Sequence, residues 1–163
     1  MWLLKHGIVS PHFAKIPFLL GQWNIGKNLS NLITNAGRSI ISGLINGPGS
    51  PVAFTYIAVG TGTTAASTPD TTLQTESSTS GLSRAAGTVS KVTTSITNDT
   101  AQVTNTFSVT GSVAVTEAGL LNAASSGTLL AHQVFSAINV QTGDSLQITW
   151  VWLLWNDAPR LGM

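Results

Sequence analysis

The sequence contains no cysteine, so disulfide bonds, thiolate metal sites and cysteine nucleophiles are excluded together. Charge is scarce as well, because Asp, Glu, Lys and Arg make up only 8% of the 163 residues, against about 25% in a typical soluble domain. The formal net charge is +1, and the seven basic residues are scattered singly, without the cluster that binds phosphate groups. We therefore expect no nucleic-acid partner. A surface this poor in charge is typical of a chain that other chains cover.

Long apolar runs are absent too. The first 20 residues are apolar in patches, but Lys5, Pro11 and Lys15 interrupt them, which makes a poor secretory signal. The apolar run at 148–155 is far shorter than the roughly 20 residues that a membrane helix needs. We expect no membrane partner.

Residues 1–27 have neither helical nor strand periodicity, and glycine and proline recur too often for a long regular element. We expect an extended arm that docks, because exposed apolar surface costs roughly 25 cal/mol per Å². Two alternatives stay open: the arm docks on another chain, or it folds back on its own domain. The candidate contact residues of the arm are Trp2, Leu3, Leu4, Phe18, Leu19 and Trp23.

An amphipathic helix is predicted over 28–47, where apolar residues follow the i, i+3, i+4, i+7 spacing. Asn28 or Ser30 can cap its start, and the sequence Asn-Gly-Pro-Gly at 46–49 ends it. Gly37 and Gly43 each weaken the helix by about 1 kcal/mol relative to alanine. Tertiary packing must therefore hold it in place.

From residue 52 onward the periodicity is that of β-strands, and Val103, Phe107 and Val109 alternate with polar residues. Short strands at this spacing predict a mainly β fold, an antiparallel jelly-roll-like β-sandwich over 52–155, followed by a tail at 156–163. The predicted strands are 52–59, 84–96, 101–110, 112–116, 120–121, 128–135 and 145–155. The long Thr/Ser/Ala loop at 63–83 is predicted to make contacts.

The last predicted strand is apolar on both faces from Val151 onward. A strand buried on both faces indicates that a second surface covers it. That surface belongs either to another copy in a homo-oligomer or to the arm or helix of the same chain. The contact candidates here are Trp152, Leu153 and Trp155.

Residues that could carry chemistry are few and isolated. His6, His12 and His132 form no set of three or four metal ligands, and we expect His132 in a strand, facing solvent or a neighbour. The stretch 60–64 superficially looks like a phosphate loop, but it lacks the lysine and the following helix of such loops. No nucleophile elbow with a histidine partner occurs either. The expectation is a non-enzymatic protein without metal or cofactor.

Most acidic residues are explained by turns, as at Asp70, Asp99 and Asp144. Glu117 differs, because it follows an apolar strand. A buried carboxylate needs a partner, and we predict a structural ion pair with Arg84.

Two groups of short segments stand out in the sequence. The first is FTYIAVGTGTTAA at 54–66 with DTTLQTE at 70–76 and Arg84; the second is VTEAGLLNA at 115–123 with LLAHQVF at 129–135 and GDSLQITW at 143–150. Together these segments resemble small virion proteins of tailed bacteriophages. The two ends, 1–27 and 151–163, depart from the pattern, so particle-specific contacts are expected there.

This resemblance implies a structural component of the virion, made in the bacterial host cytoplasm and present in many copies. Its partners would be copies of itself and other virion proteins, on the head as capsid decoration or at the neck or tail. A different class of function stays open: a binding module that contacts host-surface glycans or proteins through the 63–83 loop.

Overall fold

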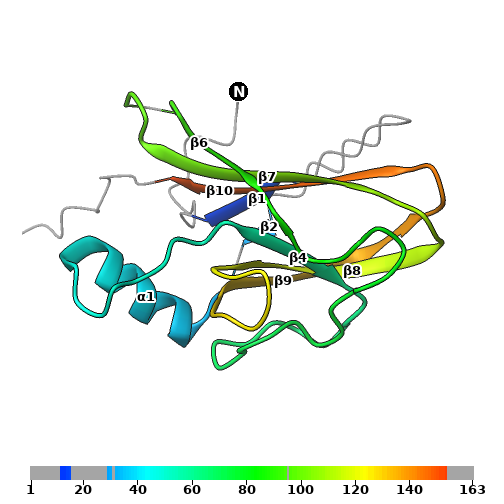
Figure 1. Cartoon of the computed structure of the whole chain (residues 1–163), viewed down its shortest axis with the longest axis horizontal. Helices are drawn as coiled ribbons and strands as arrows, with labels where there is room; N and C mark the ends of the chain where they lie inside the picture. Colours follow the sequence, from blue (N-terminus) through cyan, green and yellow to red (C-terminus); the bar gives the residue numbers. More distant parts are fainter. Residues whose placement is uncertain (1–11, 16–28, 31, 95, 154–163) are drawn as a thin grey trace, which may run out of the picture.

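The computed structural model describes residues 12–15, 29–30, 32–94 and 96–153. These residues form two five-stranded sheets and one helix (Figure 1). In chain order the elements are β1 (His12–Lys15), β2 (Leu29–Ser30), β3 (Leu32–Ile33), α1 (Asn35–Asn46), β4 (Tyr56–Gly60), β5 (Ala85–Ala86), β6 (Thr88–Val92), β7 (Thr100–Ser108), β8 (Val113–Leu121), β9 (Leu129–Val140) and β10 (Ser145–Leu153).

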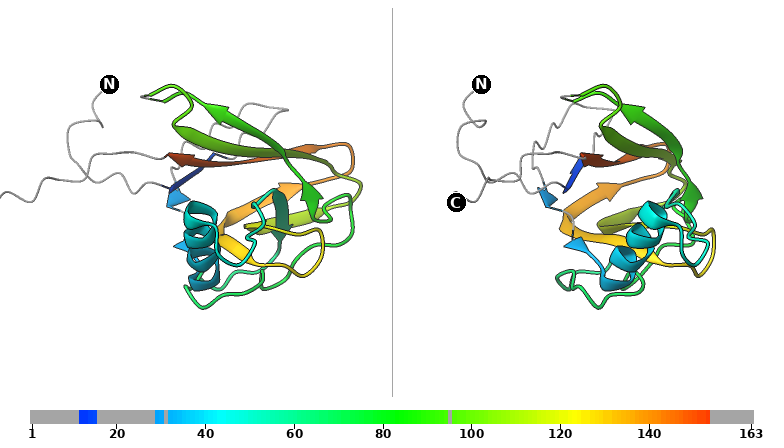
Figure 2. Two further views of the ribbon diagram at one scale, coloured as in Figure 1. Left: turned by 60° about the vertical axis from the view of Figure 1, so that its left-hand side comes forward. Right: turned by 90° about the vertical axis from the view of Figure 1, so that its left-hand side faces the viewer.

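Sheet A has the strand order β2-β1-β10-β7-β6, and sheet B has the order β3-β9-β8-β4-β5. Every ladder is antiparallel, so the predicted mainly β, antiparallel class is confirmed. Figure 2 shows the two sheets stacked, with α1 at one end of them. The loop between β4 and β5 runs along the side of sheet B that faces away from sheet A (Figure 1).

Two short stretches of chain pass from one sheet to the other. β5 pairs with β4 in sheet B, β6 pairs with β7 in sheet A, and only Gly87 separates them. In the same way β2 pairs with β1 and β3 pairs with β9, one residue apart. Because β1 also pairs with β10, each sheet runs unbroken from one of these crossings to the other, and the chain itself links the two sheets at both edges. Gly87 fits this corner because a Cβ there would lie 2.6 Å from Cγ1 of Val103.

The main core lies between the two sheets. Sheet A contributes Phe107 and Trp150, and sheet B contributes Ile57 and Leu120, all of them buried. In a strand, every second side chain points to the same face. The predicted burial of one face of β7 is confirmed at Val103 and Phe107, and the predicted burial of Val109, just beyond the strand, is confirmed too.

The helix is shorter than predicted and begins seven residues later, because the chain before it is extended. Thr34 is the N-cap: its backbone is extended, and its hydroxyl accepts a hydrogen bond from the amide of Gly37 at 2.9 Å. Leu32 and Ile33 pair with β9 instead of continuing the helix, so Asn28 and Ser30 are not its cap. The predicted end is confirmed, since Gly47 caps α1 in the left-handed conformation.

Gly37 sits where α1 crosses β9. A Cβ at this position would lie 2.6 Å from the carbonyl oxygen of Leu130, a backbone atom that has little freedom to move. We expect Gly37→Ala to destabilise the protein, although the same change at an exposed helix position stabilises by about 1 kcal/mol. Urea unfolding of Gly37→Ala beside Ser39→Ala, at an exposed position of the same helix, measures this. A stability gain for Gly37→Ala would contradict the close packing.

The aromatic strand at the end of the described chain is part of the core. Trp150 is fully buried, Trp152 is partly buried against the same core, and Leu153 is half-buried on the other face. The edge of β10 is paired with β1 of the same chain, in the register His12 to Trp152. For residues 12–15 this favours the alternative in which the arm folds back on its own domain.

The remaining predicted contact residues, Trp2, Leu3, Leu4, Phe18, Leu19, Trp23 and Trp155, lie outside the described residues, as does the tail at 156–163. In the part of the chain that is described, no helix has the length and apolar character needed to cross a bilayer.

Candidate functional site

Residues 61–76, which we name the strap, form the first part of the long loop after β4. An antiparallel bridge between Gly60 and Glu76 closes the base of the strap. Next to it, the amide of Thr61 donates to the carbonyl of Thr75 at 3.0 Å, and the amide of Ser77 donates to the carbonyl of Val59 at 2.9 Å. The predicted contact loop is therefore folded against its own sheet over this part of its length.

An apolar contact holds the strap on sheet B. Leu73 of the strap is buried in a small second cluster with Ala58, Leu121 and Leu129 on the face of sheet B away from the main core. Gly119 leaves the space for it, because a Cβ there would lie 2.9 Å from Cδ2 of Leu73 and 2.8 Å from Cδ1 of Leu129. Leu73 therefore anchors the strap through the hydrophobic effect.

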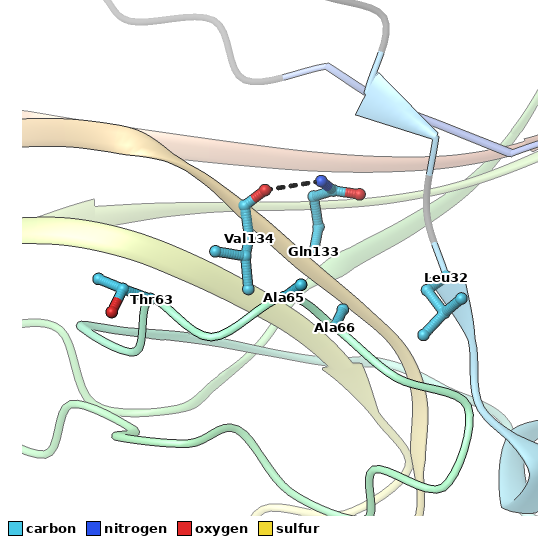
Figure 3. Close-up of a pocket in the computed structure, with 6 residues that line it drawn as sticks. All are labelled: Leu32, Thr63, Ala65, Ala66, Gln133 and Val134. Atoms are coloured by element: carbon cyan, nitrogen blue, oxygen red, sulfur yellow. Dashed lines mark hydrogen bonds between the residues drawn. The ribbon is translucent and has the colours of Figure 1, made fainter.

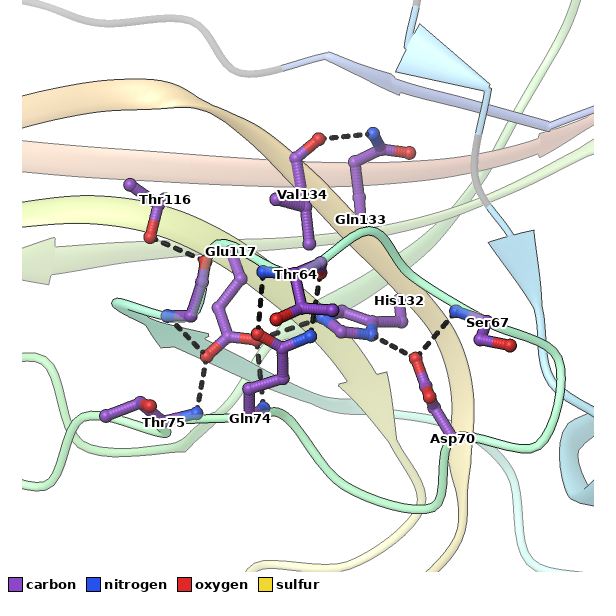
Figure 4. A network of polar contacts seen from close by, with 11 residues as sticks. Thr64, Ser67, Asp70, Gln74, Thr75, Thr116, Glu117, His132, Gln133 and Val134 are labelled. Atoms are coloured by element: carbon purple, nitrogen blue, oxygen red, sulfur yellow. Dashed lines mark hydrogen bonds and ion pairs between the residues drawn. The ribbon is translucent and has the colours of Figure 1, made fainter.

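The carboxylate of Glu117, on β8, binds both limbs of the strap (Figure 4). Oε1 accepts hydrogen bonds from the amides of Gly62 at 2.9 Å and Thr75 at 2.7 Å, and Oε2 accepts one from the amide of Gln74 at 3.0 Å. The residue is 0% exposed, so these bonds replace the water that an ionised carboxylate needs.

The glycine-rich segment at 60–62 makes this contact possible. A Cβ on Gly60 would lie 2.5 Å from Oε1 of Glu117, and a Cβ on Gly62 would lie 2.7 Å from the same atom. The hydroxyl of Thr116 donates to the carbonyl of Gly62 at 2.7 Å and fixes that limb from the neighbouring position. The segment that superficially resembles a phosphate loop thus surrounds an anion supplied by the protein itself, the Glu117 carboxylate.

His132, on β9, lies between two carboxylates (Figure 4). Its Nε2 is 2.9 Å from Oε2 of Glu117, and its Nδ1 is 2.7 Å from Oδ2 of Asp70 in the strap. The imidazole is 0% exposed. The prediction that His132 faces solvent or a neighbour is therefore wrong, because the strap covers this face of β9.

Asp70 has the turn role predicted for it and a second role besides. Its Oδ2 accepts a hydrogen bond from the amide of Ser67 at 2.8 Å as well as contacting His132. Partial burial raises the pKa of the Asp70 carboxyl, but the bonds from the Ser67 amide and the His132 ring, with the charge of that ring, outweigh burial. The pKa of Asp70 therefore lies below its usual 3.8.

This lowered pKa makes the strap contact sensitive to acid. A carboxyl whose pKa is lower in the folded state stabilises the fold fully above pH 3.8, and that contribution is lost as the pH falls through the folded-state pKa. We expect Asp70→Asn to have a lower free energy of unfolding than the wild type at about pH 6. This difference in stability, the gap between the two proteins, should narrow below about pH 4. Urea unfolding of both proteins at stepped pH measures the gap. A gap that is unchanged down to about pH 2 would contradict the assignment.

Arg84 and Glu117 have different partners, in place of the predicted ion pair. Arg84 forms a two-pronged contact with Glu76, with nitrogen to oxygen distances of 2.8 and 2.6 Å, and also donates to the carbonyls of Ala123 and Ser126. The predicted burial of Glu117 is confirmed. Its partner is His132 because both side chains point to the outer face of neighbouring strands of sheet B.

The Asp70–His132 contact has the orientation of the acid and base in a nucleophile–base–acid triad, but Nε2 of His132 faces Glu117. An ionised carboxylate at that position has no proton for the imidazole to remove. Among the described residues no group of three or more His, Asp or Glu side chains is arranged to hold a metal ion. What this arrangement does chemically is to bond a loop to a sheet.

Beside the strap lies a hollow of about 400 Å³ (Figure 3). Its lining is mainly small or apolar: Leu32, Thr63, Ala65, Ala66, Gln133 and Val134. The side-chain amide of Gln133 donates to the carbonyl of Val134 at 2.8 Å, so its nitrogen is already bonded. The lining contains no titratable side chain.

Sequence reasoning missed the joining of Asp70, His132 and Glu117. Asp70 and His132 lie 62 positions apart, and no periodicity connects a loop residue to a strand residue at that separation. His6 lies outside the described residues. Comparison of the chain with protein-family models, with curated proteins and with solved structures finds no match.

Proposed function

We propose that the chain is a non-enzymatic structural subunit of a tailed-phage virion. It would assemble with copies of itself and with other virion proteins, on the head as decoration or at the neck or tail. In this proposal the two sheets are those of a jelly-roll-like sandwich. The proposal starts from the sequence segments at 54–76 and 115–150, which resemble phage virion proteins.

One structural observation supports a structural role over a catalytic one. Glu117 and His132 are fully buried, and together with Asp70 they use their polar atoms to hold the strap on sheet B. Active sites, in contrast, present such groups to a cleft where substrate can reach them. The most chemically capable side chains of the described chain thus act within the fold.

Exposed apolar side chains near the end of α1 offer a place for neighbours to bind. Leu44 is 45% exposed, Ile45 is 81% exposed, and Val52 just after the helix is 58% exposed. In a free chain these side chains contact water, whereas a neighbour in an assembly would cover them. We expect the double variant Leu44→Glu/Ile45→Glu to fold. The number of copies of this variant in each particle should be at least tenfold lower than that of the wild type.

The test is quantitative mass spectrometry of particles purified from a host that expresses tagged copies of the chain. Hundreds of copies would place the subunit on the head or tail tube, and about a dozen or fewer would place it at the neck, baseplate or fibre. Ile96→Glu, at an apolar residue that is 68% exposed between β6 and β7, serves as the control and should be incorporated normally. Absence of the wild-type chain from particles would refute the proposal.

A further inference from the structure

The imidazole of His132 contacts an acceptor at both ring nitrogens. A doubly protonated ring donates to both Oδ2 of Asp70 and Oε2 of Glu117, at 2.7 and 2.9 Å. A neutral ring has one N–H, so one of its nitrogens then turns a lone pair toward a carboxylate oxygen. The observed arrangement is thus complete only when the ring carries both protons.

We propose that Asp70, His132 and Glu117 form a protonation-dependent clamp that releases the tip of the strap from β9 when the imidazole loses one of its two protons. The tip is the turn at 67–70, which the hydrogen bond from the Asp70 amide to the Ser67 carbonyl closes. Loss of that proton removes one of the two contacts, and the surroundings of the carboxylates decide which contact is lost.

The two carboxylates differ in what holds them when the ring is neutral. Glu117 is inaccessible to water and is bonded to three amides of the strap, so the remaining ring proton stays with it. Asp70 is 23% exposed and can exchange its ring contact for water. The contact at the tip is therefore the one that opens, while the limbs of the strap stay bound to Glu117.

Among the residues that the structure describes, no other charged group faces the ring from the elements packed against it. β8 contains one ionisable residue, Glu117, and β3 contains none. In α1 the charged residue is Arg38, which is exposed. In the strap, Glu76 lies at the base and is paired with Arg84. The charge balance of the clamp is thus set by the three side chains themselves.

Opening of the tip also breaks a hydrogen bond at the start of α1. The amide of Asn35, in the first turn of the helix, donates to the carbonyl of Thr68 near the tip of the strap at 2.8 Å. When the tip leaves, this amide loses its acceptor and becomes accessible to solvent. Exchange of the Asn35 amide with solvent hydrogen therefore reports whether the clamp is closed.

The experiment is residue-specific NMR on the full chain from about pH 5 to pH 10, which follows the ring nitrogens of His132 and the hydrogen-exchange protection of the Asn35 amide. Protection is corrected for the intrinsic rise of exchange rate with pH. We expect protection at Asn35 to fall at least tenfold over the pH range in which the ring passes from two N–H groups to one. The amides of Val103 and Ile148, which lie in the β7–β10 ladder of sheet A, should keep constant protection over that range.

Asp70→Asn is the matched variant. Its amide can accept from a protonated ring nitrogen through the oxygen, or it can turn its NH₂ to an unprotonated one at the expense of the Ser67 contact. In this variant we expect the tip to stay closed on both sides of the ring titration. Three outcomes would overturn the proposal: a ring with a single N–H throughout, constant protection of Asn35 in the wild type, or equal pH dependence in Asp70→Asn.

Discussion

Replacing Glu117 by glutamine is expected to lower the free energy of unfolding by about 3–5 kcal/mol. The change keeps the shape of the side chain but turns one acceptor oxygen into a donor. Oε1 accepts from Gly62 and Thr75, whereas Oε2 accepts from Gln74 and faces His132. If Oε1 becomes NH₂, the amides of Gly62 and Thr75 lose their acceptor and meet a donor. If Oε2 becomes NH₂, the amide of Gln74 loses its acceptor, and so does His132 when its ring carries a proton on Nε2.

Urea unfolding followed by circular dichroism measures the loss, with Glu76→Gln as the matched control because it makes the same chemical change. Glu76 is partly exposed, Arg84 is 10% exposed, and glutamine at 76 still offers Arg84 one acceptor, so a cost of about 1–2 kcal/mol is expected, clearly below that of Glu117→Gln. Equal costs for the two variants would show that the buried carboxylate of Glu117 contributes no more to stability than the partly exposed one of Glu76. The strap of Glu117→Gln should also be cut by thermolysin well before the sheets.

Replacing Trp150 by alanine is expected to cost about 3–5 kcal/mol, because it empties the largest fully buried side-chain site of the described core. Trp150 lies in β10, next to Val103 of β7 in the ladder. Its Nε1 has no hydrogen-bond partner among the described residues, so the indole contributes through its apolar surface. Trp150→Phe, which removes that buried donor and retains an aromatic ring, should cost clearly less than Trp150→Ala.

Trp152→Ala is the control, since the same chemical change at a partly exposed side chain two residues away removes less buried surface. A cost of about 1–2 kcal/mol is expected there. Denaturant unfolding of the three variants ranks them directly. If Trp152→Ala costs as much as Trp150→Ala, the core is centred nearer the end of β10 than the structure places it.

The fold class was predictable because burial in a strand repeats every second residue. Val103, Phe107 and Leu146 follow that rule, and each is buried. The start of α1 was not predictable, because Leu32 and Ile33 fit a helical face as well as a strand. The deciding contacts are non-local: Leu32 pairs with His132, a residue a hundred positions away in the chain.

The candidate site was predictable in part. Glu117 follows apolar residues in a strand, and its burial could be inferred from that position. Its partners could not be inferred, because they depend on how β9 aligns with β8. That ladder has irregularities between Val115 and Glu117 and between Leu120 and Leu121, which shift the register without a signal in the sequence.

The pairing of early strands with late ones has a consequence for how the chain is made. The strands synthesised first have partners that are synthesised last, since β1 pairs with β10 and β3 pairs with β9. A growing chain on the ribosome therefore cannot complete either sheet until β9 and β10 have emerged. Contacts between such distant segments are formed slowly, on a scale of about milliseconds to seconds in small β proteins. During that interval the tryptophans of β10 and the apolar face of β4 have no permanent cover.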